Sequence, residues 1–212
     1  EGPVAVFPDS TPALPMAGRE RHFFRDLVPN IRILSAIPDE GVGNPTWLHV
    51  SGHFLLDPDF WIGSAFLEGR QRTGPQALLD ATRSCSLLSL GVCHAGNSYS
   101  SASPYWLGFA ELFLARGISA LLVSRWALDD LSMRIYRDFY VCCRQGMAMD
   151  EALALAKRRF LGLRLERNGV TAPGSHPYFW GGVAYIGSPG ARLYDPVLFI
   201  WPLWLTPLAA AS

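Results

Sequence analysis

Two side chains capable of acid–base or nucleophilic chemistry follow directly after strand-like runs of the sequence. His53 comes after residues 47–51 and Gly52, and Cys93 comes after residues 87–92. In parallel α/β sheets, functional groups gather beyond the carboxyl ends of the strands, so adjacent strands would bring this imidazole and this thiol together. The thiolate is the nucleophilic form of cysteine, and an imidazole base generates it. The pattern is typical of a Cys/His pair, although a buried structural cysteine and a hydrogen-bonded structural histidine also fit it.

The residues beside this pair offer two further features. Ala95 and Gly96 are small, which would leave their backbone N–H groups free to bind an oxyanion. His49 lies four residues before His53 and would share its face on a strand, which raises a zinc-dependent hydrolase as an alternative. With no fourth ligand at suitable spacing, we interpret His49 as a buried residue that orients the strand. We expect neither metal nor cofactor.

The elements that would position these residues alternate between strands and helices. Short apolar or β-branched runs alternate with amphipathic stretches, which predicts one α/β domain. The expected architecture is a three-layer sandwich of helices around a mostly parallel sheet. Strands are predicted at 4–7, 31–34, 47–51, 65–67, 87–92, 120–123 and 183–186, and helices at 16–27, 75–83, 104–116, 131–144 and 149–165.

Composition narrows the function. The 212 residues are 50% hydrophobic and 17% charged, which suits a globular domain. Lys plus Arg and Asp plus Glu number 18 each, so net charge gives no reason to expect nucleic acid or an anionic membrane as a partner. The four cysteines form no CxxC pair, which favours reduced thiols in a cytoplasmic protein. No glycine-rich phosphate loop follows the first strand, which argues against a nucleotide site.

The two ends of the sequence carry their own expectations. The chain begins at Glu1 and enters a strand-like run at once, so we expect a piece of a longer protein. Residues 196–212 are uncharged and apolar, but 17 residues interrupted by Pro202 and Pro207 barely reach the length of a membrane span. We therefore expect a packed tail at 191–212 rather than membrane insertion.

Several segments resemble one family in the same order. The segment 48–54 (LHVSGHF) is similar to the histidine segment of the CHAT domain, a caspase-like peptidase module found beside TPR repeats, and 90–96 (LGVCHAG) is similar to its cysteine segment. Residues 123–126 (VSRW) resemble the family's strand ending in SLW, and Asp130 sits at its following acidic position. The likeness extends from about residue 14 to residue 187.

The resemblance implies both a fold and an activity. It implies the fold shared by caspases, separases and gingipains, in a CHAT domain at residues 1–190. It implies His53 and Cys93 as the catalytic pair of a cysteine endopeptidase that cleaves protein substrates through a thioester. It also implies an effector role in a larger regulated protein, with a TPR or other repeat or regulatory domain on the N-terminal side.

The sequence departs from the family near the expected site. Phe54 stands where the family has glycine, His94 where it has Glu or Gln, and Arg125 where it has leucine. A catalytically weak pseudopeptidase that acts as an interaction module therefore stays as an alternative.

Two residues after the strand at 120–123 are predicted to bind substrate. Trp126 would form an apolar wall, and Asp130 would pair with an arginine side chain before the scissile bond. Asp129 and Asp130 also suit the capping of a helix start, and the two roles are compatible.

Overall fold

The computed structural model describes residues 2–7, 15–38, 41–55, 65–68, 71–82, 85–93, 98–99, 107–167 and 169–194. The sequence-based expectations for His94, Ala95, Gly96 and residues 195–212 lie outside this part of the chain.

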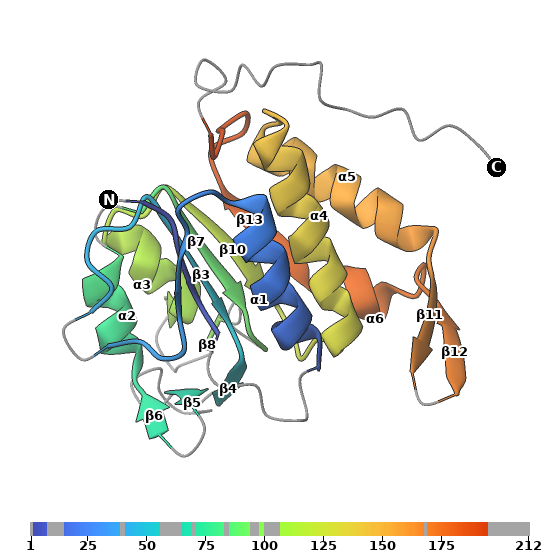
Figure 1. Ribbon diagram of the computed structural model, residues 1–212, viewed down its shortest axis with the longest axis horizontal. Coiled ribbons are helices and arrows are strands. Elements are labelled where there is room, and N and C mark those ends of the chain that lie inside the picture. The colour runs from blue at the N-terminus through green and yellow to red at the C-terminus, as the bar shows by residue number, and fades with distance from the viewer. Residues whose placement is uncertain are drawn as a thin grey trace.

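A six-stranded sheet forms the centre of the fold, in the order β13-β10-β7-β3-β1-β2 (Figure 1). Its strands are β1 (Val4–Val6), β2 (Arg32–Leu34), β3 (Trp47–Ser51), β7 (Leu87–Gly91), β10 (Ala120–Ser124) and β13 (Val183–Gly187). All neighbours run parallel except β13, which is antiparallel to β10. Every residue of β3, β7 and β10 is buried, as continuous apolar runs in doubly covered strands require.

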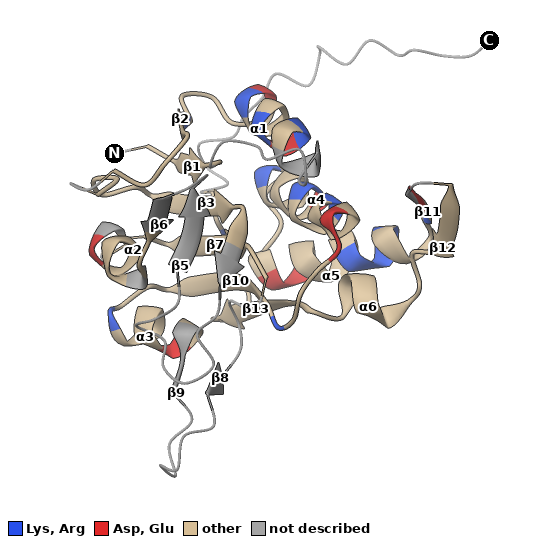
Figure 2. Ribbon diagram, turned by 90° about the horizontal axis from the view of Figure 1, so that it is seen from below, with Lys and Arg blue, Asp and Glu red and all other residues tan. Residues whose placement is uncertain are grey.

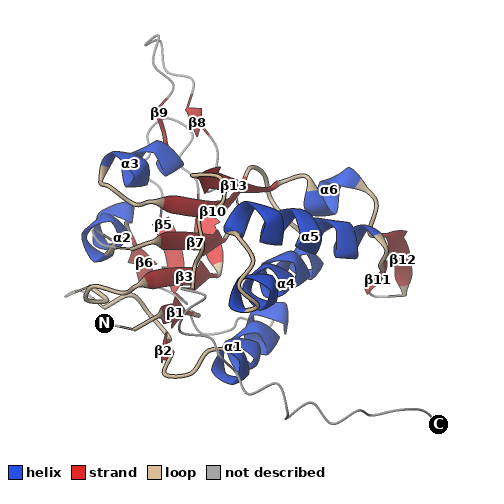
Figure 3. Ribbon diagram, turned by 90° about the horizontal axis from the view of Figure 1, so that it is seen from above, coloured by secondary structure: helices blue, strands red, loops and turns tan. Residues whose placement is uncertain are grey.

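Helices cover both faces of this sheet (Figure 3). One face carries α1 (Pro15–Leu27), α4 (Met133–Arg144), α5 (Met149–Leu161) and the short α6 (Pro177–Trp180). The other carries α2 (Pro75–Ala81) and α3 (Phe109–Ala115). The mostly parallel three-layer sandwich predicted from the sequence is thus confirmed.

Side chains alternate between the two layers along each central strand. Leu48 and Val50 of β3 belong to the apolar cluster under α2 and α3, whereas Trp47 belongs to the cluster under α1 and α4. This alternation follows from the two-residue period of a strand. It also places His49 on the α1 and α4 face, among the aromatic rings of that cluster.

Smaller antiparallel elements surround the sandwich. β4 (His53–Leu55), β5 (Ala65–Glu68) and β6 (Gln71–Thr73) form a three-stranded sheet. β8 (Ser98–Tyr99) pairs with β9 (Leu107–Gly108), and β11 (Arg164–Arg167) pairs with β12 (Val170–Pro173). A 3-10 turn, η2 (Asp130–Ser132), precedes α4.

Two helix predictions were wrong at their ends. The helix expected at 149–165 stops at Leu161, because Gly162 ends it and the chain then turns into the β11–β12 hairpin. The helix expected at 104–116 begins only at Phe109, since the two preceding residues form β9.

The described chain continues past the last strand and packs on the sandwich. Ala191, Leu193 and Tyr194 lie partly buried against the cluster under α1 and α4. The backbone N–H of Met149 donates to the oxygen of Ala191 over 2.8 Å. Core packing therefore extends at least to Tyr194, inside the segment expected to be a tail. Among the described residues, no helix is both long and apolar enough to cross a membrane.

Candidate active site

β3 and β7 pair in parallel with a constant separation of 40 residues, from Trp47 and Leu87 to Ser51 and Gly91. A further backbone bond, from Gly52 N to Gly91 O over 3.4 Å, extends this ladder beyond the last pair. His53 and Cys93 have the same separation and follow two residues after that pair. The two predicted site residues therefore leave neighbouring strands at the same edge of the sheet.

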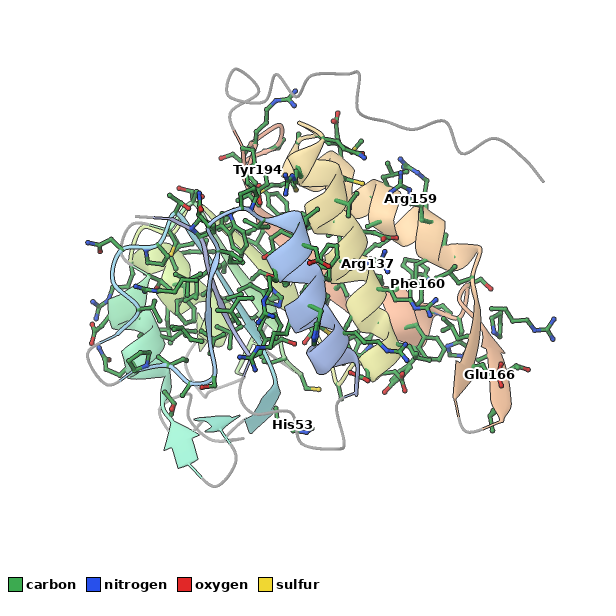
Figure 4. The ribbon with its side chains drawn as sticks, in the orientation of Figure 1. His53, Arg137, Arg159, Phe160, Glu166 and Tyr194 are labelled. Carbon is green, nitrogen blue, oxygen red and sulfur yellow. The ribbon has the colours of Figure 1, made fainter. Side chains whose placement is uncertain are left out.

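The chain changes sheets at His53. β3 ends at Ser51, Gly52 forms a bend, and His53 is the first residue of β4, where it pairs with Leu67 of β5. The histidine thus stands at the junction between the central sheet and the small antiparallel sheet. Figure 4 shows it at the end of the molecule toward which β3 runs, far from Tyr194 at the opposite end.

Cys93 differs from the other three cysteines in accessibility. It lies in a turn after β7 and is partly exposed, whereas Cys85, Cys142 and Cys143 are buried. Burial raises the pKa of Cys85 to about 12 and raises the pKa of both Cys142 and Cys143. A thiol needs solvent access and a thiolate form to act as a nucleophile, so Cys93 is the cysteine best placed to react.

Side chains of two neighbouring elements hold the end of β7 and the residue that follows it. The hydroxyl of Tyr136 on α4 donates to the backbone oxygen of Leu90 over 3.2 Å, and the hydroxyl of Ser124 on β10 donates to that of Val92. These contacts hold the strand end that presents Cys93. The sequence alone did not reveal them, because the partners are 46 and 32 residues apart.

Trp126 lies on the other side of β7 from His53. β10 pairs with β7 at a separation of 33 residues, and the same separation relates Trp126 to Cys93. The partly buried indole donates through Nε1 to the backbone oxygen of Tyr178 over 3.0 Å. A Cβ added to Gly182 would lie 2.8 Å from that nitrogen, so the ring is tightly packed against the turn before β13.

Of the two aspartates, Asp129 is the one that caps η2. Its carboxylate accepts from the backbone N–H of Leu131 over 2.9 Å, and its backbone is extended, as is usual at an N-cap. Asp130 is the first residue of η2 and partly buried. The capping expected from the sequence thus belongs to Asp129.

His49 is completely buried, and its ring nitrogens are engaged in the core. Nδ1 lies 2.9 Å from Ser89 Oγ, and Nε2 lies 3.3 Å from Glu20 Oε1. Within the described residues, no group of three His, Cys, Asp or Glu side chains could hold a metal ion. These contacts agree with a structural role for His49.

A mostly parallel six-stranded sheet with helices on both faces agrees with a caspase-like α/β domain. The family model of the CHAT domain matches residues 20–188, and the chain belongs to this family. No curated protein matches the chain. The resemblance inferred from residues 48–54 and 90–96 is therefore confirmed at the level of the family.

Proposed function

We propose that this chain is a cysteine endopeptidase in which Cys93 is the nucleophile and His53 the general base. The observation that carries the proposal is their common position two residues beyond the last β3–β7 pair. Family membership supports the same reaction class, since CHAT domains are related to caspase-like peptidases.

The proposed reaction begins with proton transfer from Cys93 Sγ to the imidazole of His53. The thiolate attacks the carbonyl carbon of the scissile peptide, and the electron pair of the carbonyl moves to its oxygen. When the C–N bond breaks, the imidazolium gives its proton to the leaving amine, and a thioester remains on Cys93. Water, losing a proton to His53, then hydrolyses the thioester to a carboxylic acid and restores the thiol.

Trp126 and Asp130 are the proposed substrate-binding residues. The β10–β7 register relates Trp126 to Cys93, and its indole is held by Tyr178 and Gly182. Asp130 begins the turn that follows, four residues further along the chain. A carboxylate here would pair with an arginine side chain of the substrate in a bidentate manner.

The wider setting is part of the proposal. All four cysteines, Cys85, Cys93, Cys142 and Cys143, are free thiols, as is usual in a reducing compartment, and on this ground we propose the cytoplasm. We also propose a repeat or regulatory domain on the N-terminal side in the full-length protein, because CHAT domains often adjoin TPR repeats.

A pseudopeptidase is the second candidate, and Phe54 is the observation that favours it. This residue follows His53 directly, in β4, where it pairs with Phe66 of β5. The family has glycine at this position, and the backbone N–H of that glycine helps bind the oxyanion in caspase-like enzymes. A larger residue there would weaken catalysis and leave a protein-binding domain.

Labelling and cleavage together test the proposal. The full chain and its Cys93→Ala variant are incubated with a peptidyl electrophile ending in arginine, and the adduct is mapped by mass spectrometry. Cleavage products in a whole proteome are then compared for the two proteins. We expect an adduct on Cys93 and cleavages that vanish in the variant. Identical cleavage patterns, with Cys93 unlabelled, would exclude the peptidase and leave the pseudopeptidase.

A further inference from the structure

A buried carboxylate faces the central sheet from α1. Glu20 is only 4% exposed to solvent. Lys, Arg, Asp and Glu are absent from five strands of the central sheet, β1, β3, β7, β10 and β13. Figure 2 shows these charged residues mainly on the helices. Removing a carboxylate from water costs several kcal/mol unless partners compensate. The contacts of Glu20 therefore indicate what the charge does.

The partner of Glu20 is His49, in the middle of β3. Glu20 Oε1 lies 3.3 Å from His49 Nε2, within ion-pair distance but without hydrogen-bond alignment. His49 Nδ1 lies 2.9 Å from Ser89 Oγ on β7 and 3.4 Å from the hydroxyl of Tyr140 on α4. One imidazole thus connects α1, β3, β7 and α4.

Aromatic rings enclose this imidazole. The ring centroids of Phe24, Tyr140, Phe7 and Tyr136 lie 4.8, 5.6, 5.7 and 6.2 Å from that of His49. Phe24 packs α1 against this imidazole, and hydrophobic residues often replace buried polar pairs without loss of stability. Anchoring of the helix alone does not explain a charge at this place.

The contact between Glu20 and His49 lies on the same two strands as the candidate site, before their carboxyl ends. His49 and Ser89 are paired on β3 and β7 with the 40-residue separation that also relates His53 to Cys93. On this face of the sheet the pair Ser51 and Gly91 lies between them, and the side chain of Met133 fills the space beside Gly91. A Cβ at Gly91 would lie 3.4 Å from His49 Cε1 and 2.6 Å from Met133 Cε. A shift of His49 against β7 would therefore change the spacing of the two strand ends.

Tyr136 gives a second connection between this contact and the site. Its hydroxyl holds the backbone of β7 at Leu90, three residues before Cys93. Burial raises the pKa of Tyr136, and the proximity of Glu20 and Cys93 raises it further. The two groups therefore lie within electrostatic reach of the same phenol.

We propose that Glu20 is a positioning residue, which through His49 holds the ends of β3 and β7 at the spacing that lets His53 deprotonate Cys93. The proposal rests on the proposed peptidase function and adds a residue that touches neither substrate nor the reacting atoms. Without the carboxylate, His49 loses one of its three polar contacts, and the spacing of the strand ends relaxes. A displacement of about 1 Å is enough to impair a proton-transfer pair.

The test measures the rate of Cys93 alkylation by iodoacetamide as a function of pH in the full chain. Glu20→Gln keeps the size of the side chain and removes its charge, and Glu20→Ala removes both. Val28→Ala, a change of another buried residue just after α1, is the matched control for lost stability. Thermal unfolding is measured for every variant. The His53→Ala variant, in which Glu20 is kept, is measured in the same way.

We expect both Glu20 variants to lower the rate of Cys93 alkylation at pH 7 about tenfold. The midpoint of the pH profile should move upward by about one pH unit, because a shift of one pKa unit changes the thiolate fraction at pH 7 about tenfold. Val28→Ala should lower the unfolding temperature and leave the profile unchanged. If Glu20→Gln shares the profile of the parent, Glu20 serves folding only and the proposal is wrong. If Glu20→Ala does not fold, the Glu20→Gln result decides alone.

The His53→Ala profile separates this proposal from the peptidase function. If His53→Ala leaves the profile unchanged, His53 does not deprotonate Cys93, and the proposed function fails first. If His53→Ala shifts the profile but Glu20→Gln does not, the dyad stands and only the positioning role is overturned. Where peptide cleavage is measurable, Glu20→Gln should lower kcat and leave KM near the parent value.

Discussion

The indole nitrogen of Trp126 donates to the backbone oxygen of Tyr178 over 3.0 Å, and this bond ties the end of β10 to α6. The backbone N–H of Arg125 donates to the oxygen of Gly182 over 2.8 Å, which joins the residue after β10 to the residue before β13. The ring beside the candidate site is therefore held in one position before any substrate arrives. A rigid wall of this kind lowers the entropic cost of binding a long side chain.

Gly182→Ala should displace this ring. The new Cβ would lie 2.8 Å from both Trp126 Nε1 and Leu128 Cδ2, and such overpacking costs about 1–3 kcal/mol. We expect a lower free energy of unfolding in urea and a higher KM for peptide substrates. Gly162→Ala is the control, since its Cβ would meet only Arg159 O at 3.6 Å. Equal effects of the two substitutions would contradict the packing of Trp126 described here.

Cys93 should react with iodoacetamide faster than the other three cysteines at neutral pH. Cys85, Cys142 and Cys143 are buried and their thiols have raised pKa values, about 12 for Cys85, so they stay protonated at pH 7. Brief labelling of the native protein followed by peptide mapping measures the four rates. Uniform modification, or protection of Cys93, would count against its assignment as nucleophile.

His53→Ala and His49→Ala should fail in different ways. Loss of His53 should abolish proteolysis, because the proposed general base is then missing. The unfolding temperature should stay nearly unchanged, because His53 is partly exposed. His49→Ala leaves Glu20 buried without its partner, which costs about 3–5 kcal/mol. Some proteolysis should remain at temperatures where this variant is folded. Circular dichroism and peptide cleavage on the same samples distinguish the two effects.

The sandwich could be predicted from the sequence because its strands are long apolar runs. Residues 87–92 and 120–123 are uniformly hydrophobic or small, and such runs suit parallel strands covered on both faces. The hairpin after α5 was missed because Leu161 and Leu165 extend the helical pattern across Gly162. The dipeptide Asn168-Gly169 was the available signal, since it is typical of a two-residue hairpin turn.

The site could be predicted only in part. His53 and Cys93 stand out because each follows an apolar strand, and a parallel sheet brings strand ends together. The Glu20–His49 pair could not be found this way, because nothing in the sequence of α1 indicates that this one carboxylate faces the sheet. Tertiary packing decides it: the ring of Phe24, on the next turn of α1, is tilted against the same imidazole with its centroid 4.8 Å away.

The end of the domain can be located by truncation. A chain ending at Tyr194 should unfold at the same urea concentration as the full chain, because the described core contacts are then complete. A chain ending at Gly190 loses Ala191, Leu193 and Tyr194, and we expect it to be less stable by about 2–5 kcal/mol. Equal stability of these two truncated chains would show that the packing of Tyr194 contributes nothing.

Specificity should depend on Asp130 and not on Asp129. Asp129 caps η2 through Leu131 N, so Asp129→Ala should cost about 1 kcal/mol of stability and leave substrate preference unchanged.

Asp130 begins the turn that follows Trp126, where a partly buried carboxylate would bind a guanidinium through two parallel hydrogen bonds. We expect a peptide library varied at the residue before the scissile bond to show a preference for arginine over lysine, because the lysine ammonium cannot form that bidentate pair. Asp130→Asn should weaken this preference about tenfold, the effect of roughly 1.4 kcal/mol, with the unfolding temperature unchanged. A preference for acidic or apolar residues would exclude this pocket, and equal losses of stability in the two variants would show that both aspartates serve the turn.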